Sequence, residues 1–342
     1  MTETVTRIRG EPCSAGGGPK KGTRRLASHT QYGNVWELKS SSCSTMVIQN
    51  TMRTIPFRHD CSEDIRDYKV AVECYREALH EPDSVMIEMG SVQYLRPFGL
   101  NLLSGMICDL LRNGQEVSLT PPRSTQVQQY LTDQGFYTEF QVGRSGSLKR
   151  ALKSTSVGLR RLDDRDYTYL SAVALWLNQN SQIPLERVKD MVMVTMPEVI
   201  NNVFDHSDSP FGCYVCAEAY AREQRLMLSV MDFGVGFLYR LSGLYPQLHS
   251  DAEAIALAVK DGISSKRSRR NAGRGLHILS DWVRHREGEL EIISQDGHWT
   301  QDLAGRTRTE TLPFYFPGTC INLCVHTGKL PAQQDDEWRR YD

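Results

Sequence analysis

Glu198, Asn202 and His206 have a spacing that suits phosphoryl chemistry, because each lies four residues after the last. Residues four apart on an α-helix lie nearly above one another, so the three would cover roughly 12 Å of one helix face. A glutamate and an asparagine one turn apart can hold a hydrated divalent cation and orient a water or hydroxyl. An ordinary amphipathic helix with polar residues in solvent has the same pattern, so the trio alone leaves both interpretations open.

A second group of residues follows an apolar segment, from Arg225 to Met231, that predicts a strand. Asp232 at its end can accept a hydrogen bond from an exocyclic amine. Gly234 and Gly236 would let the backbone approach a ligand closely. A strand followed by a glycine turn is common, so this group too is weak evidence when taken alone.

A third group lies between Asn271 and Val283, where a glycine-rich loop opens an amphipathic helix. A helix N-terminus presents free N–H groups and the positive end of the helix dipole, which suit phosphate oxygens. The segment is not a Walker A loop, because the Gly-Lys-Ser/Thr ending is absent, and its glycine spacing does not fit the Rossmann motif. A flexible loop before a surface helix would have the same composition. Farther on, Gly318 and Thr319 enter an apolar strand.

In this order, the four groups resemble the motifs of the GHKL superfamily, which includes DNA gyrase, the heat-shock chaperone ATPase, histidine kinases and mismatch-repair ATPases. The resemblance covers roughly the C-terminal half of the chain. It implies an α/β sandwich, with a mixed sheet covered by helices on one face, that binds ATP and Mg²⁺. Glu198 to His206 matches the N box, in which Glu198 would be the general base and Asn202 the Mg²⁺ ligand.

The other implied nucleotide contacts come from the remaining motifs. They are His206 at the end of the N box, Asp232 as the adenine-binding residue of the G1 box with its neighbours Gly234 and Gly236, the G2 box residues Gly273, Arg274, Gly275 and Leu276, and Thr319 beside the adenine site.

The segment from about Leu238 to Ala272 lies where the superfamily has its variable ATP lid. It contains a helix-like apolar run, Ala252 to Val259, and then a basic cluster, Ser264 to Arg270. That cluster would reach nucleotide phosphates or an acidic partner when the lid closes, and Lys266 is the first member to test. A basic cluster of this kind more often belongs to a solvated, mobile loop.

Length, charge and cysteine content limit the kinds of protein that this chain can be. The chain has 342 residues, 40% of them hydrophobic, which is enough for two domains. Its formal net charge of −1 gives no general reason to expect nucleic-acid binding. It lacks an apolar run of membrane-spanning length and the apolar core of a signal peptide, so we expect a cytoplasmic protein with no membrane partner. Nine scattered cysteines fit reduced thiols. Cys213 and Cys216 lie in a strand-like segment without a second ligand pair, which favours packing over zinc binding.

Five segments organise the chain. They are a basic, disordered tail at 1–45, an α/β block at 46–145, a linker at 146–158, the ATP-binding domain at 159–330 and a frayed tail at 331–342. The expected elements are helices at 65–79, 98–111, 124–132 and 167–178, strands at 85–89, 116–120 and 317–325, and a loop or hairpin at 298–316. The ordered part would begin at Met46 or Met52 if the start codon has been placed too far upstream.

The block at 46–145 resembles a STAS domain, the fold of anti-sigma factor antagonists. The matching features are the strand at Val85, the helix opened by Arg96-Pro-Phe-Gly99, and the strand and helix that follow. Phosphorylated STAS domains carry Ser or Thr just before the glycine, whereas Pro97 and Phe98 stand here, which argues against a phosphorylation switch in this block. The resemblance implies a docking or scaffold role, while a small α/β domain of another use would show the same elements.

Together the two resemblances predict an ATP-binding switch with slow, Mg²⁺-dependent hydrolysis, in which lid closure changes the surface offered to a partner. One alternative is a serine/threonine protein kinase of the anti-sigma type, with Glu198 activating a hydroxyl on a partner's STAS domain. Another is an interaction module that binds ATP without turnover, although an intact Glu198 favours catalysis. The expected protein partner is a STAS or other regulatory protein. Lid exchange between protomers is common in the superfamily, which implies a homodimer.

Overall fold

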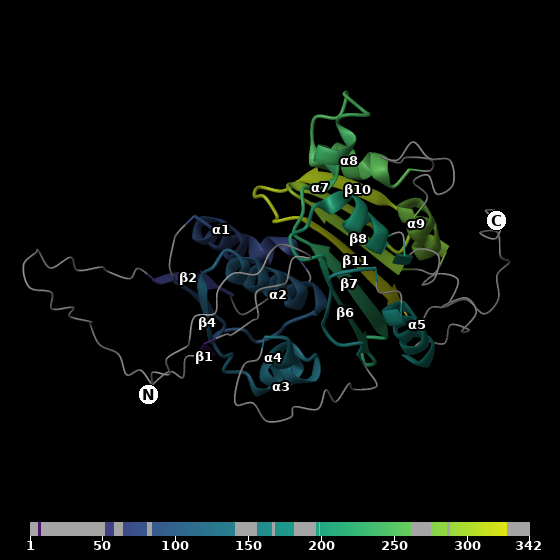
Figure 1. Cartoon of the computed structure of the whole chain (residues 1–342). Coiled ribbons are helices and arrows are strands. Elements are labelled where there is room, and N and C mark those ends of the chain that lie inside the picture. Colours follow the sequence, from purple (N-terminus) through teal and green to yellow (C-terminus); the bar gives the residue numbers. More distant parts are fainter. Residues whose placement is uncertain are drawn as a thin grey trace, which may run out of the picture.

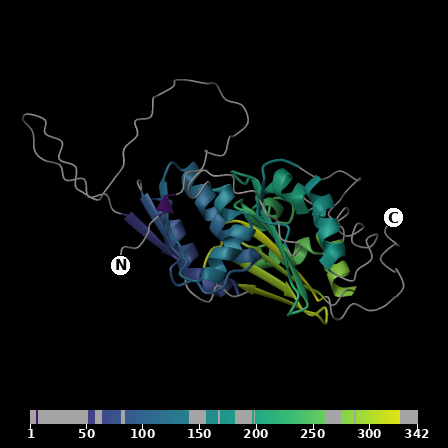
Figure 2. The same ribbon diagram turned by 90° about the horizontal axis from the view of Figure 1, so that it is seen from below.

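Two β-sheets organise the chain, and helices lie between them and beyond the second sheet (Figures 1 and 2). The computed structural model describes residues 6–7, 52–57, 64–80, 84–140, 156–165, 168–180, 196–197, 199–260, 275–285 and 288–326. The fold is a mixture of helices and sheets, which confirms the predicted α/β class. None of the helices in these ranges has an apolar stretch long enough to cross a bilayer.

The first sheet has the strand order β1-β4-β3-β2. Its three parallel strands are β2 (Met52–Pro56), β3 (Ser84–Glu88) and β4 (Glu116–Thr120). A short strand, β1 (Thr6–Arg7), pairs antiparallel with β4 at the edge. These two residues belong to the stretch predicted to be disordered, and their pairing corrects that prediction at this point. The other residues of that stretch lie outside the described part of the chain.

The helices of the first block follow the predicted pattern closely. They are α1 (Lys69–Ala78), preceded by the 3₁₀ turn η1 (Ile65–Tyr68), α2 (Pro97–Arg112), α3 (Thr125–Asp133) and the short α4 (Phe136–Glu139). Ser124 caps α3, because its hydroxyl accepts a hydrogen bond from the Val127 N–H at 3.4 Å. Gly135, with a φ of 82°, opens α4 in the left-handed conformation that glycine adopts easily.

Helix α2 is buried on nearly all sides because it lies between the two sheets (Figure 2). Pro97 occupies its first turn, where a missing N–H costs nothing. On the second sheet, the side-chain amide of Asn101 donates to the Ser229 carbonyl at 2.9 Å. A Cβ atom added to Gly105 would lie 2.1 Å from the Phe233 ring, so glycine is what allows the helix and this ring to meet. The two blocks therefore share one hydrophobic core.

The second sheet has the strand order β10-β9-β8-β11-β7-β6-β5. Its strands are β5 (Arg160–Leu162), β6 (Cys213–Tyr220), β7 (Arg225–Asp232), β8 (Gly288–Ser294), β9 (Gly297–Gln301), β10 (Thr307–Thr311) and β11 (Thr319–His326). Every described pairing in this sheet is antiparallel, which corrects the expected mixed sheet. Short turns after β6, β8 and β9 reverse the chain and so make neighbouring strands antiparallel.

Helices cover both faces of the second sheet rather than the single face expected. The far face packs against α5 (Thr168–Asn180), α7 (Gly236–Leu241), α8 (Asp251–Ala258) and α9 (Gly275–His285) in a separate hydrophobic core. Helix α2 covers the near face.

Ser156 forms a bridge with Glu218, and the Val157 N–H donates to the Ala217 carbonyl at 3.0 Å. The predicted linker at 146–158 therefore ends before Ser156.

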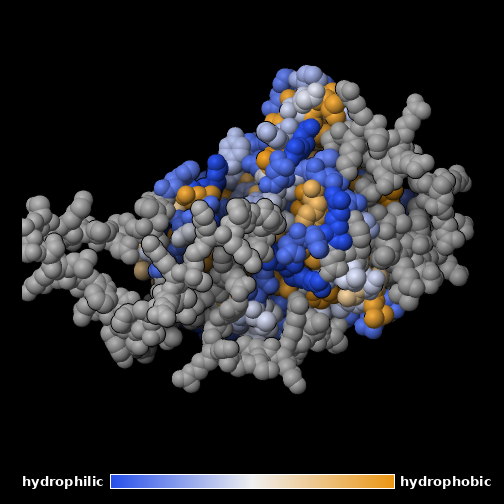
Figure 3. Space-filling view, in the orientation of Figure 1, coloured by the Kyte–Doolittle hydropathy of each residue, from blue (hydrophilic) through white to orange (hydrophobic). Residues whose placement is uncertain are grey.

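The surface seen in Figure 3 is largely hydrophilic over its described part, with hydrophobic side chains in separate patches. One patch lies at the top of this view, over the segment that joins α7 to α8. Leu244 in that segment is 40% exposed, and Tyr239 on α7 is 66% exposed.

Candidate functional site

Four residues from four strands form a line across the end of the second sheet. Asp232 on β7 lies between Cys213 on β6 and Thr319 on β11, and Ser294 on β8 follows Thr319. We call these four residues the Asp232 row. Side chains alternate along a strand, and this parity places the row on the face covered by α5, α7 and α9. The hydroxyls of Thr319 and Ser294 lie 3.1 Å apart. The strand pairing therefore brings the predicted site residues Asp232 and Thr319 together with Ser294, which was not predicted.

Asp232 is a buried acceptor at the centre of this row, and only 5% of it is exposed. Burial raises the pKa of its carboxyl group to about 7, and hydrogen bonds from the backbone N–H groups of Gly234 and Thr319 offset part of this rise. The Gly234 N–H donates to Asp232 Oδ1 at 2.8 Å. The backbone N–H of Gly234 in the glycine loop and that of Thr319 on β11 thus hold the carboxylate in place. A ligand amine would add a charge-assisted hydrogen bond.

The glycine loop after Asp232 contacts Ser207, the residue that follows the predicted N box. The Val235 N–H donates to the Ser207 carbonyl at 2.7 Å. A Cβ atom on Gly234 would lie 2.1 Å from the same oxygen, so this approach requires glycine. Gly236 has a φ of +79° and opens α7, whose Phe237 N–H donates to Ser294 Oγ at 3.1 Å. The glycine loop is therefore in direct contact with the end of the helical segment that carries the predicted N box.

The N box helix does not keep the α-helical spacing expected from its sequence. Residues 199–202 are helical, but the helix widens into a π-helical segment, η2 (Val203–Ser207), before it ends. Asn202 and His206 are both half-buried, and the His206 carbonyl accepts a hydrogen bond from Arg240 Nε. Arg240 also pairs with Asp208, which ties α7 to the N box. Glu198, the predicted general base, lies outside the described residues.

The expected lid begins as packed helix. Ser250 caps α8 by accepting from the Glu253 N–H at 3.2 Å, and α8 packs on β9 and β10. Burial raises the pKa of Asp251 in the first turn of α8 to about 6, although its carboxyl accepts from the Leu238 N–H.

The rest of the predicted lid and the first residues of the predicted G2 box fall outside the described residues, including Lys266, Gly273 and Arg274. The described part of the predicted helix is α9, which runs from Gly275, and Leu276 is buried in the far-face core.

Four contributors to this site were not predicted from the sequence: Ser207, Ser294, Arg240 and Gln295. Ser207 acts through its backbone carbonyl, which has no side-chain signature. Ser294 becomes part of the site only because β8 pairs with β11. The Arg240 contact depends on the position of α7. Gln295, which donates from its side chain to the Gly234 carbonyl at 3.0 Å, is recognisable only once the β8–β9 hairpin is known.

A second polar cluster lies on the opposite face of the same sheet. His298 is 6% exposed, and its two ring nitrogens contact Glu291 at 2.8 Å and Glu310 at 2.9 Å. Burial opposes a charge on this imidazole, but the hydrogen bonds and charges of the two carboxylates outweigh burial and raise its pKa. Glu310 also pairs with Arg66 of η1, so the cluster joins the first block to β10.

Cys213 and Cys216 lie in β6 with their side chains in different cores on opposite faces of the sheet. Burial raises the pKa of both thiols. The two thiols face away from each other, so they cannot share a metal ion, and their contacts are those of packing residues.

A scan against protein-family models matches no family, and a search of curated proteins finds no similar sequence. The chemistry of the site is therefore inferred from its own geometry. The Asp232 row holds a buried carboxyl group and two hydroxyls, next to a glycine loop that contacts the end of a polar helix. Such a set can hold a flat, hydrogen-bonding group that bears an amine.

Proposed function

We propose that the chain binds ATP with Mg²⁺ beside the Asp232 row and acts as a nucleotide switch with slow hydrolysis. The observation that carries this proposal is the direct pairing of Asp232 with Thr319, beside a glycine loop whose Val235 contacts Ser207, the residue that follows the N box. Four sequence motifs that are far apart would then serve one ligand. This arrangement supports the resemblance to GHKL-type ATPases, with the adenine amine donating to Asp232.

The residues present fit an Mg-nucleotide. Asn202 makes no side-chain capping hydrogen bond to η2, so its amide oxygen is not used to begin that helix. It would be the protein ligand of Mg²⁺, which neutralises phosphate charge when bound. Glu198 would orient and deprotonate the attacking water. The start of α9 at Gly275 would offer backbone N–H groups to the phosphates.

The first block is placed to respond to the nucleotide. Phe233 directly follows Asp232, and its ring packs against Gly105 of α2 and lies 5.9 Å from the Tyr75 ring, centroid to centroid. A change in the backbone at Asp232 would therefore reach α1 and α2 through one packed side chain. We propose that this contact carries the output of the switch to a STAS or other regulatory protein bound by the first block.

A protein kinase is the second candidate, and the STAS-like block is the feature that favours it. The start of α2 is not a suitable acceptor within this chain. Pro97 and Phe98 have no hydroxyl and are buried, and Phe98 stacks on Phe316 with ring centroids 6.1 Å apart. A kinase would have to act on a hydroxyl of a separate partner.

The test follows γ-labelled ATP with the full-length protein, Mg²⁺ and candidate STAS proteins. Glu198→Ala is the test variant, and Glu73→Ala, on the exposed side of α1, is the matched control. We expect label to be released as free phosphate by the wild type and by the control, while Glu198→Ala binds ATP without turnover. Label on a Ser or Thr of a partner would indicate a protein kinase instead of an ATPase. ATP that stays bound and intact would indicate a binding module without turnover, and absence of ATP binding would refute the proposal.

A further inference from the structure

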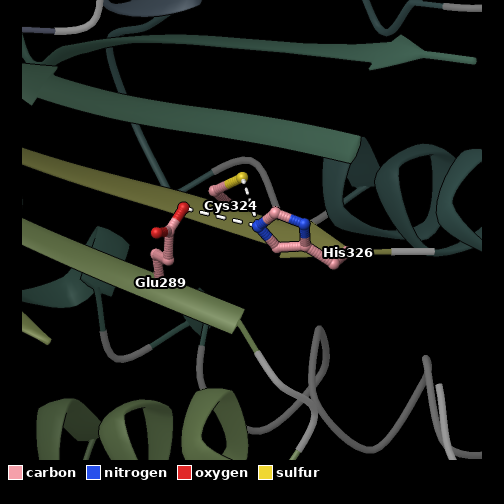
Figure 4. A group of neighbouring side chains, drawn as sticks. All are labelled: Glu289, Cys324 and His326. Atoms are coloured by element: carbon pink, nitrogen blue, oxygen red, sulfur yellow. Dashed lines mark hydrogen bonds and ion pairs between the residues drawn. The ribbon is translucent and has the colours of Figure 1, made fainter. Parts of the chain in front are cut away.

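Glu289, Cys324 and His326 bring three different metal-binding groups together on the face of the second sheet opposite the Asp232 row (Figure 4). Cys324 on β11 is the direct register partner of Glu289 on β8. His326 follows two residues later, so its side chain projects from the same face as that of Cys324. The carboxylate oxygen, the sulfur and the imidazole nitrogen all lie within 4.8 Å of one another.

The separations of these atoms fit ligands around a common ion better than direct hydrogen bonds. His326 Nε2 lies 3.4 Å from Glu289 Oε2 and 3.9 Å from Cys324 Sγ. An N–H···O hydrogen bond is most often about 2.9 Å long. A tetrahedral zinc ion, with bonds of about 2.0 to 2.3 Å, places its ligand atoms roughly 3.3 to 3.8 Å apart. Small side-chain movements would complete that geometry.

The backbone holds these groups ready for an ion. All three residues lie on paired strands in the middle of a seven-stranded sheet, so their Cα positions are set by the ladder. Cys324 is buried, whereas Glu289 and His326 are half-buried, so the group remains open on one side. Figure 4 shows Nε2 of the imidazole directed at both partners.

A cavity of about 320 Å³ adjoins the group and gives an ion a path to it. Glu289 and Cys324 form part of its wall, together with the carboxylates of Glu291 and Asp302, which favour the entry of cations. Two arginines lie near these carboxylates. Arg96 lines the same cavity, Arg225 is the register partner of His326, and both are paired with Glu223. The cavity also has room for a water molecule as an additional ligand.

We propose that Glu289, Cys324 and His326 bind Zn²⁺ in a site whose fourth position opens to this cavity. A thiolate, an imidazole and a carboxylate together suit zinc, whereas Mg²⁺ and Ca²⁺ prefer oxygen ligands alone. On binding, the Cys324 thiol exchanges its proton for the ion, and the proton passes to solvent. The site is independent of the proposed nucleotide site, because the two lie on opposite faces of the sheet.

The test uses Co²⁺ as a spectroscopic probe on the full-length protein after chelator treatment, followed by displacement with Zn²⁺. We expect stoichiometric binding with a thiolate-to-cobalt charge-transfer absorption that Zn²⁺ abolishes. Cys324→Ser should lose that absorption, whereas Cys320→Ser should keep it, because Cys320 is a buried thiol on the same face of the same strand. His326→Gln should weaken Zn²⁺ binding by more than the roughly 10- to 100-fold that loss of an outer-shell contact costs.

Absence of Co²⁺ binding, or a charge-transfer absorption that survives Cys324→Ser, would overturn the proposal. Circular dichroism and thermal melting of each variant separate lost binding from lost folding. Glu289→Gln supplies a second test that leaves the buried thiol in place. It should keep the charge-transfer absorption but bind Zn²⁺ more weakly in a chelator competition, and an unchanged affinity would remove Glu289 from the site.

Discussion

Replacing Asp232 by Asn changes one atom and tests the proposed nucleotide site most directly. The variant keeps the shape of the side chain, and its Oδ1 can still accept the hydrogen bond from the Gly234 N–H. It removes the negative charge that a nucleobase amine would meet. A hydrogen bond to a charged group contributes about 1.5 to 3 kcal/mol, so we expect ATP to bind roughly 10- to 150-fold more weakly to Asp232→Asn.

The same substitution has an opposite expected effect on stability. Burial raises the pKa of Asp232 from 3.8 to about 7, so the native state holds a proton more tightly than the unfolded state between these values. Stability contributed by this group is therefore greatest below about pH 4 and falls as the pH rises toward 7. The difference corresponds to on the order of 4 kcal/mol of charge burial above pH 7. Asn carries no such penalty, so the variant should be at least as stable as the wild type at pH 8.

Two measurements distinguish an adenine contact from a structural role for Asp232. Titration calorimetry gives the affinity for ATP between pH 6 and pH 8, and urea unfolding gives the free energy of unfolding over the same range. Binding to the ionised carboxylate should make wild-type affinity fall as the pH falls below 7, and this dependence should be smaller in the variant, which serves as the control for protonation of ATP itself. Unchanged affinity in Asp232→Asn would refute the adenine contact. Weaker binding accompanied by lower stability at pH 8 would assign Asp232 a structural role instead.

Two further predictions concern the contact between the blocks. Gly105→Ala places a Cβ atom 2.1 Å from the Phe233 ring and should lower the free energy of unfolding by about 1 to 3 kcal/mol, whereas Gly243→Ala, with nothing within 4 Å, should be near neutral in the same urea titration. The folded pKa of His298 is raised above 6.5, so its stabilising effect is complete below about pH 6.5 and is lost as the pH rises through the folded pKa. His298→Gln should therefore be less stable than the wild type by about 1 to 3 kcal/mol at pH 6, and a difference that does not shrink at higher pH would contradict this sign.

Several local features could be predicted from the sequence because neighbouring residues determine them. Strand β4 has the predicted bounds, and α3, capped by Ser124, begins one residue after the predicted start, since alternation and a side-chain cap operate within a few residues. Strand β7 and the start of α9 also follow local patterns. The order of the motifs indicated which residues to compare with a nucleotide site. None of this local information specifies which strands lie side by side.

Tertiary structure alone decided what surrounds those residues. Asp232 and Thr319 are 87 positions apart in the chain, and only the pairing of β7 with β11 makes them neighbours. The all-antiparallel sheet, the burial of α2 between two sheets and the meeting of Gly105 with Phe233 likewise depend on long-range packing. The group of Glu289, Cys324 and His326 has no signature in sequence, because a one-residue change in strand register would turn these side chains to the other face. The sequence by itself determined the types of elements and the chemical groups available, whereas the register of the sheet determined which groups meet.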